Sequence, residues 1–175
     1  MNEKKVLMII AHENFRDEEL LTPKEIFEKK GFKVQVVSTD TTPAKGMLGA
    51  IIKPDGIVYN EDFSKYDAVV MVGGMGSPVY WDDKKIHTKL QEYYKDEKKV
   101  LAAICLAPGT LARAGLLKGK KATVWKSAAD EIKKGGGTYT GSPVERDGRI
   151  ITGNGPDAAK AFAEEIVKVL LEAEK

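Results

Sequence analysis

The residue most able to do chemistry in this 175-residue sequence is its single cysteine, Cys105. The stretch 100–109, VLAAICLAPG, places it between an apolar, strand-like run and Pro108, which suits the first turn of a helix. A tight strand-to-helix turn lifts a side chain above the sheet and brings a sulfur to backbone amides, which lowers a thiol pKa. Free cysteines also often pack as small buried apolar groups. The position favours a reactive thiol, with simple burial as the alternative.

Two other strand ends carry polar or glycine-rich segments. Gly73 and Gly74 follow the apolar run 67–72 and would bring backbone amides to a developing oxyanion, although a tight turn alone also explains a glycine pair. Four acidic residues follow the first apolar run: Glu13, Asp17, Glu18 and Glu19. A carboxyl group beside a thiolate is pushed toward its protonated form and can donate a proton. Acidic residues are equally favoured in a first helical turn, so the pattern does not choose among the four.

The two histidines, His12 and His87, are far from Cys105 in the sequence. His12 ends the first apolar run and is a candidate general base, with a structural, hydrogen-bonded histidine as the alternative. His87 falls in a charged segment, which predicts solvent exposure and no role. One cysteine and two dispersed histidines give no metal-ligand spacing, and glycine motifs of the dinucleotide or Walker type are absent. We therefore expect neither a metal nor a cofactor.

The elements that must position these residues follow from the hydropathy pattern. Short apolar, β-branched runs alternate with segments of helical period, which is typical of parallel strands joined by crossover helices. Strands are predicted over 6–11, 32–38, 67–72, 99–104 and 122–125, hairpins within 46–58 and 144–151, and helices over 20–31, 84–97, 108–119 and 157–172. The pattern predicts an α/β fold of flavodoxin-like type, a parallel sheet with helices on both faces plus small β-hairpins. Ligands of such sheets bind beyond the carboxyl ends of the strands, where Cys105 would lie.

Composition narrows the class of protein. The length suits one domain, 1–175, and 28 Lys and Arg against 26 Asp and Glu give a net charge of +2 from interspersed residues, which does not favour nucleic-acid binding. No apolar run approaches the roughly 20 residues that cross a bilayer, and residues 1–5 lead directly into the first strand. One free cysteine suits a reducing compartment. We expect a soluble, cytoplasmic protein with no membrane partner.

Several segments together resemble the PfpI-like superfamily, which has a class I glutamine amidotransferase-like fold and includes the parkinsonism-associated deglycase. They are VLMIIA from Val6, DEELLTP from Asp17, DAVVMVGG from Asp67, and AIC from Ala103 followed by APG. The resemblance extends over the whole chain, including the VERDGRIITG hairpin at 144–153 and the final helix. Position by position, it implies that Cys105 is the nucleophile, that Glu19 is the acid facing it, and that Gly74 and the amide of Met75 form the oxyanion region.

Two positions depart from the pattern that this resemblance implies. Leu106 stands directly after the cysteine, where protease-like members have histidine, and Trp125 closes a predicted strand where other members have histidine. The base of a Cys-His protease is therefore missing, and only His12 remains as a substitute. Peptidase activity is not expected, and Leu106, Trp125 and His12 are candidates for lining a substrate site.

The functional expectation is a cysteine-dependent enzyme acting on small reactive carbonyls, similar to glyoxalases or deglycases. The alternative is a non-enzymatic oxidation sensor or stress protein, in which an oxidant converts Cys105 to a sulfinate that Glu19 and nearby amides hold. A decayed site in an assembly module is a third reading. The resemblance also implies a homodimer or a larger homo-oligomer. Phe15, Tyr80 and Trp81 are predicted in loops beside the site, where large aromatics suit an interface or the pocket itself.

Overall fold

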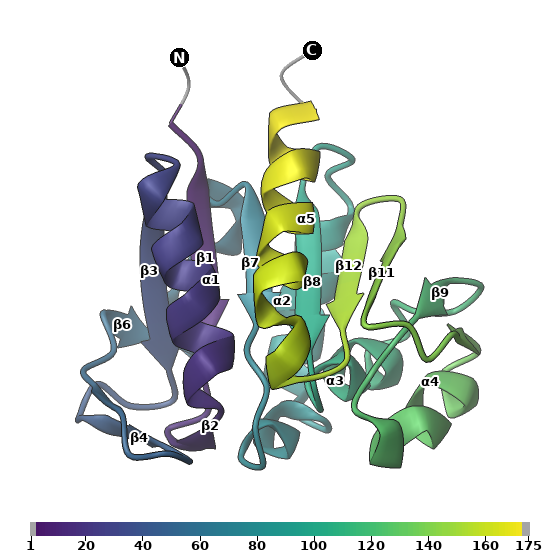
Figure 1. Cartoon of the computed structure of the whole chain (residues 1–175), viewed down its shortest axis with the longest axis horizontal. Coiled ribbons are helices and arrows are strands. Elements are labelled where there is room, and N and C mark those ends of the chain that lie inside the picture. Colours follow the sequence, from purple (N-terminus) through teal and green to yellow (C-terminus); the bar gives the residue numbers. More distant parts are fainter. Residues whose placement is uncertain (1–2, 173–175) are drawn as a thin grey trace.

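The computed structural model describes residues 3–172, in which a twisted sheet lies between two layers of helices (Figure 1). The ends of the predicted domain, residues 1–2 and 173–175, lie outside the described residues. Within 3–172 the main sheet has seven strands in the order β11-β12-β8-β7-β1-β3-β6. They are β1 (Lys5–Ile9), β3 (Lys33–Ser38), β6 (Gly56–Ile57), β7 (Ala68–Met71), β8 (Val100–Ile104), β11 (Val144–Asp147) and β12 (Ile150–Gly153). All neighbours are parallel except β11 and β12.

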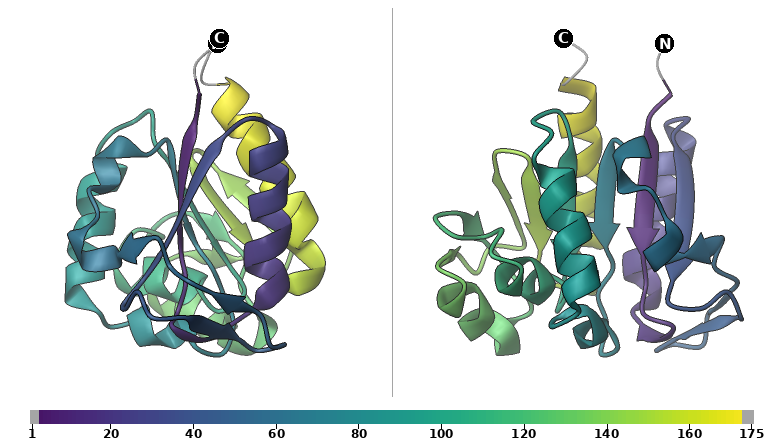
Figure 2. Two further views of the ribbon diagram at one scale, coloured as in Figure 1. Left: turned by 90° about the vertical axis from the view of Figure 1, so that its left-hand side faces the viewer. Right: turned by 180° about the vertical axis from the view of Figure 1, so that it is seen from behind.

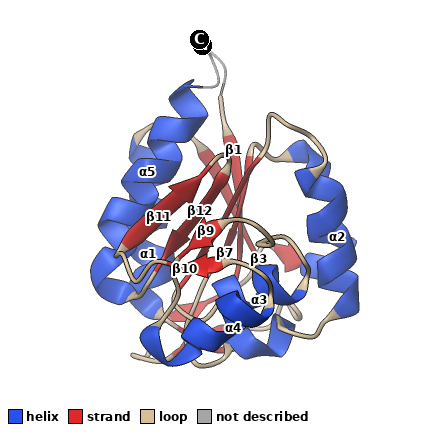
Figure 3. Cartoon of the chain, turned by 90° about the vertical axis from the view of Figure 1, so that its right-hand side faces the viewer, coloured by secondary structure: helices blue, strands red, loops and turns tan. Residues whose placement is uncertain are grey.

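Helices cover both faces of this sheet, as Figures 2 and 3 show from the side. One face carries α1 (Asp17–Lys29) and α5 (Ala159–Glu172), which pack against each other. The other carries α2 (Lys84–Tyr94) and α3 (Pro108–Arg113). The five central parallel strands have the flavodoxin-like order, with β1 between its successor β3 and the later strand β7. The predicted α/β class and doubly covered parallel sheet are confirmed.

Burial on both faces explains why the central strands read as continuous apolar runs. Successive side chains of a strand point to opposite faces, so both faces need apolar residues when helices cover both. In β1, Met8 lies in the core shared with α1 and α5, while Leu7 lies in the core shared with α2 and α3. Residues of β8 divide in the same way, and its five residues are all buried.

Smaller sheets and short helices fill the loops. A three-stranded sheet joins β2 (Glu13–Phe15), β4 (Ala44–Gly46) and β5 (Ile51–Ile52), and a two-stranded sheet joins β9 (Lys121–Ala122) and β10 (Thr138–Tyr139). The remaining α-helix is α4 (Ala129–Lys134). Short 3-10 helices are η1 (Val58–Asn60), η2 (Phe63–Lys65), η3 (Ser77–Tyr80), η4 (Lys126–Ala128) and η5 (Pro156–Ala158). No helix described between residues 3 and 172 has the length and apolar character needed to cross a membrane.

Several predicted boundaries were wrong. The hairpin predicted within 46–58 is formed only by β4 and β5, because β6 joins the main sheet beside β3 and Val58 begins a 3-10 turn. The strand predicted over 122–125 keeps only Ala122, and Trp125 instead precedes a 3-10 turn. Helices α2 and α3 end at Tyr94 and Arg113, earlier than predicted. The hairpin near 144–151 is confirmed as β11 and β12.

Three side chains predicted at the surface are buried. His87 is 4% exposed, because it shares the sheet-facing side of α2 with Ile86, Leu90 and Tyr93. Phe15 and Tyr80 are also buried within the chain, and the Tyr80 hydroxyl donates to the carbonyl of Ile10 at 2.8 Å. The predicted role of Phe15 and Tyr80 as interface aromatics therefore loses its support.

Candidate active site

Cys105 lies at the turn between β8 and α3, in a backbone conformation that only a well-fixed residue keeps. Its φ angle is +65°, in the left-handed region, which costs a non-glycine residue about 1–3 kcal/mol. The neighbouring structure holds this turn from both sides: the Cys105 amide donates to the Gly153 carbonyl at 2.9 Å, and the Cys105 carbonyl accepts from the Trp125 amide at 2.8 Å. The side chain is 8% exposed. The predicted strand-to-helix elbow is present.

Glu19 is the acidic residue that lies against Cys105. It sits in the first turn of α1 and is 0% exposed, and the groups that face its carboxyl group are the thiol of Cys105 and the backbone amide of Gly73. A Cβ atom added to Gly73 would collide with both the Glu19 carboxylate and the Cys105 side chain, so the two lie close together against the same face of this glycine. Glu18 instead pairs with Arg16 at 2.8 Å on the surface of the helix. Packing of α1 thus separates two adjacent glutamates that the sequence could not rank.

Burial dominates the electrostatics of this pair. Loss of water around Glu19 raises the pKa of its carboxyl group to about 8. Burial, followed by the negative charge of Glu19, raises the pKa of the Cys105 thiol to about 12, although the amides of Gly74 and Leu106 act to lower it. The expectation of a low thiol pKa is therefore contradicted. A carboxyl group that titrates near neutral pH beside a protonated thiol is suited to accept the thiol proton during a reaction.

Backbone amides surround the sulfur, but one differs from the expected set. The amides of Gly74 and Leu106 face the Cys105 thiol. The amide of Met75 instead donates to the sulfur of Met47 at 3.4 Å. The contribution of Leu106 is its amide, and its place directly after the cysteine in an elbow was the sequence signal for it.

A pocket of about 250 Å³ opens above Cys105. Its lining residues are Arg16, Met47, Gly74, Met75, Cys105, Leu106, Trp125, Ser127 and Pro156. The structure thus places Gly74, Met75, Leu106 and Trp125 in the lining of the pocket that holds Cys105, with Glu19 behind the thiol. His12 is not part of the lining, and its ring nitrogen is hydrogen-bonded to the Thr42 carbonyl at 2.9 Å.

Met47 reaches the pocket through a clamp that sequence reasoning missed. The buried carboxylate of Asp17 accepts hydrogen bonds from the amides of Leu48 at 2.9 Å and Ala50 at 2.8 Å. These bonds fix the turn between β4 and β5, which carries Met47. Asp17 therefore serves the shape of the pocket, and its position in the acidic segment gave no signal that distinguished it from Glu19.

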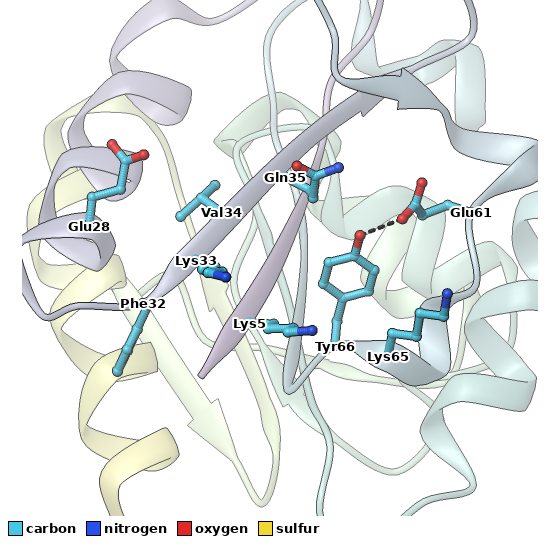
Figure 4. A pocket seen from close by; sticks show the side chains of 9 residues that line it. All are labelled: Lys5, Glu28, Phe32, Lys33, Val34, Gln35, Glu61, Lys65 and Tyr66. Carbon is cyan, nitrogen blue, oxygen red and sulfur yellow. Dashed lines mark hydrogen bonds between the residues drawn. The ribbon is translucent and has the colours of Figure 1, made fainter. Parts of the chain in front are cut away.

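A second pocket, of about 520 Å³, lies at the amino ends of strands β1 and β3, whereas Cys105 lies at the carboxyl end of β8 (Figure 4). It surrounds Tyr66 and the starts of β1 and β3, with Lys5, Lys33 and Lys65 at its margin. Because it lies at the amino ends of the strands, it is remote from the Cys105 elbow. Within residues 3–172 no cluster of three or more His, Cys, Asp or Glu side chains is arranged to hold a metal ion.

A strained cysteine at a strand-to-helix elbow, with a buried carboxyl group behind it and a parallel sheet below it, defines a class of α/β proteins that present a thiol at a strand end. Residues 4–169 match the DJ-1/PfpI family, and the chain belongs to this family. The resemblance seen in the sequence is thereby confirmed.

Known proteins similar to this chain include enzymes and proteins without an assigned activity. An uncharacterized protein from Methanocaldococcus jannaschii is 46% identical over 97% of this chain and 84% of its own length. A deglycase from Thermococcus kodakarensis is 29% identical, covering 94% of this chain and 98% of the relative. The crystal structure of a ThiJ/PfpI domain protein from Brachyspira murdochii matches with a TM-score of 0.92 at 32% identity, over 98% of this chain and 99% of that chain.

Proposed function

We propose that this protein is a cysteine-dependent enzyme acting on small reactive carbonyls, in the manner of glyoxalases or deglycases. The observation that carries the proposal is the fully buried carboxyl group of Glu19, which lies against the Cys105 thiol. The likeness to a relative named a deglycase supports it. Neither histidine is bonded to the cysteine, since His12 contacts Thr42 and His87 contacts Trp81, so Cys-His peptidase chemistry is not proposed.

The proposed reaction begins with addition of the thiol to an aldehyde. The sulfur forms a bond to the carbonyl carbon, the π electrons move to the oxygen, and the amides of Gly74 and Leu106 stabilise that oxygen. The ionised form of Glu19 takes the thiol proton, and the carboxylic acid that results gives this proton to the oxygen of the adduct. In an α-oxoaldehyde, a further proton transfer oxidises the former aldehyde carbon to a thioester on Cys105 while it reduces the neighbouring carbonyl carbon to an alcohol. Water then attacks the thioester, the carbon–sulfur bond breaks, and a hydroxy acid and the Cys105 thiol are released. No external oxidant or reductant is consumed.

The pocket favours a substrate with an apolar substituent. Its walls are largely thioether, leucine, indole and proline groups, from Met47, Leu106, Trp125 and their neighbours. The charged side chain in the lining is Arg16, whose guanidinium group is already matched by two hydrogen bonds to Glu18 at 2.8 and 3.0 Å. An anionic substrate would lose water without gaining an unmatched cation.

The test is turnover of phenylglyoxal and glyoxal by the wild-type chain. We expect conversion of phenylglyoxal to mandelate and of glyoxal to glycolate, with a kcat/KM for phenylglyoxal at least about tenfold higher, because burial of an aromatic ring is favourable by a few kcal/mol. Wild-type protein whose thiol has been blocked with iodoacetamide is the matched control and should be inactive. Absence of turnover with both dicarbonyls would overturn the proposal.

The second candidate is an oxidation sensor. It is supported by the lack of an imidazole at the thiol and by the two amides that would hold sulfinate oxygens. A structural neighbour at 28% identity is an oxidized DJ-1 of Toxoplasma gondii. Oxidation proceeds through the thiolate, so with a raised thiol pKa it requires Glu19 to take the thiol proton, as the addition to an aldehyde does. A wild-type chain that turns over no dicarbonyl but gains two oxygens at Cys105 under mild peroxide would favour the sensor.

The protein is also proposed to form a homodimer that borders the pocket. Large apolar residues are exposed in the segments that contribute to the pocket: Met75, which lines it, is 72% exposed, Leu48, next to the lining residue Met47, is 62% exposed, and Val79, in the turn after Met75, is 60% exposed. Such residues are typical of contact surfaces. Light scattering at micromolar concentration should give about twice the 19.2 kDa of one chain, whereas a 19.2 kDa species would contradict a stable dimer.

A further inference from the structure

Trp81 lies behind the nucleophile elbow and holds it by one directed bond. Its indole N–H donates to the carbonyl of Leu106 at 2.9 Å. Its ring packs so closely on α3 that a Cβ atom added to Gly109 would lie 2.6 Å from the indole nitrogen. Trp81 does not line the Cys105 pocket, so its contact is with the backbone that carries the cysteine rather than with a substrate.

The elbow needs such a support because its conformation is unfavourable in isolation. A residue with a positive φ angle persists only where its surroundings fix it. The amide and carbonyl of Cys105 are bonded to Gly153 and Trp125. The next carbonyl, that of Leu106, accepts from the Trp81 indole at 2.9 Å and from the Gly109 amide at 3.1 Å. These bonds leave the Leu106 amide facing the thiol. The Leu106 amide shares a peptide plane with the Cys105 carbonyl, which the Trp125 amide holds, and the Trp81 bond holds the next peptide plane. Together they fix Leu106 from both sides, and its amide is one of the two donors that a developing oxyanion would meet.

Trp81 is itself anchored on both sides. The buried His87 lies in α2 and its ring nitrogen donates to the Trp81 carbonyl at 2.7 Å. The guanidinium group of Arg113 lies 4.6 Å from the centre of the indole ring and is held by ion pairs to Asp82 and Glu131, both at 2.8 Å. A chain of fixed contacts thus runs from α2 through Trp81 to the elbow.

We propose that Trp81 is a positioning residue for the Cys105 reaction and that His87 is its anchor. The indole N–H keeps Leu106 in the orientation that directs its amide at the sulfur, and His87 keeps the indole in place. This role deepens the proposed function and rests on it for the catalytic part, whereas the effect on the thiol itself does not depend on any substrate.

The experiment uses Trp81→Phe, which keeps an aromatic ring and removes the donor. The rate of Cys105 alkylation by iodoacetamide is expected to change by at least about fivefold, because a displaced amide alters the environment of the thiol. With phenylglyoxal, kcat should fall by about tenfold while KM stays within about twofold, since Trp81 does not line the pocket. A purely structural role would leave the alkylation rate of the folded protein unchanged.

Two sets of controls separate positioning from loss of stability. Tyr80→Phe removes a buried hydrogen bond from the preceding residue to Ile10 and should leave the alkylation rate unchanged. His87→Gln retains an N–H donor for the Trp81 carbonyl and should behave like the wild type, whereas His87→Leu should follow Trp81→Phe. Thermal unfolding of each variant identifies any that does not fold.

Superimposable alkylation rates for wild type and folded Trp81→Phe would overturn the proposal. If Trp81→Phe does not fold, the comparison of His87→Leu with His87→Gln decides, and equal alkylation rates in these two overturn it as well. If the wild type turns over no dicarbonyl while Trp81→Phe still alters alkylation, the proposed function fails and the positioning role stands.

Discussion

Cys105→Ser is expected to lower the kcat/KM for phenylglyoxal by at least about 10³-fold, because a hydroxyl group at this position remains protonated and is a much weaker nucleophile than sulfur. Serine keeps nearly the same volume and the same backbone bonds to Gly153 and Trp125. The fold should therefore be retained, with a Tm within a few degrees of the wild type. The measurement is initial-rate consumption of phenylglyoxal beside thermal unfolding.

The matched control for Cys105→Ser is Ser127→Ala, which changes a polar side chain of the same pocket without touching the elbow. It should retain activity within about fivefold. A Cys105→Ser variant as active as the wild type would remove the cysteine from the mechanism. If Cys105→Ser is inactive because it does not fold, the thiol-blocked wild type decides whether the thiol is needed, since its sequence is unchanged. It must also be inactive.

Much of the fold could be predicted because local and long-range signals agree. The runs of β7 and β8 are apolar without alternation, and both faces of the sheet are indeed covered by helices. The elbow at Cys105 was marked by its position between such a run and Pro108. In contrast, β6 and β9 have two residues each, and hydropathy carries little information over such a length.

The acid could not be selected from residue types because Glu18 and Glu19 occupy the same helical turn. Adjacent helical positions differ by about 100° around the axis, so only the rotation of α1 against the sheet decides which one is buried. Met47 reaches the pocket from a distant hairpin that Asp17 fixes, and no local pattern announces this contact.

The burial of His87 had a signal that a charged segment obscured. Ile86, Leu90 and Tyr93 recur at helical spacing, and His87 lies three residues before Leu90 on the same side of α2. The many charges of this helix occupy its other side. Composition alone therefore predicted exposure, whereas the helical period indicated a position at the margin of the buried face.

Glu19→Gln is expected to remove the part of the pH dependence of the unfolding free energy that arises from ionisation of Glu19. The folded-state pKa of Glu19 is raised from 4.5 to about 8 by burial, so the folded protein retains a proton that the unfolded chain releases above about pH 4.5. The stability contributed by protonated Glu19 is fully present below the pKa that this residue has in the unfolded chain. It is lost as the pH rises through the pKa that Glu19 has in the folded protein. The loss amounts to roughly 4 kcal/mol by about pH 8.

Chemical denaturation of wild type and Glu19→Gln across this pH range measures the effect as a difference, in which all other titrating groups cancel. The stability of the wild type relative to the variant should fall by about 1.4 kcal/mol per pH unit between the two pKa values and level off above the higher one. Glu18→Gln is the matched control, because the pKa of Glu18 is lowered by its hydrogen bond to Arg16 and its stabilisation is instead lost toward acid.

The Glu19→Gln variant should also lose about 10²-fold or more in phenylglyoxal turnover, since an amide accepts no proton. A relative stability independent of pH would mean that the pKa of Glu19 is not raised in the fold, and would contradict the ionisation assigned to it.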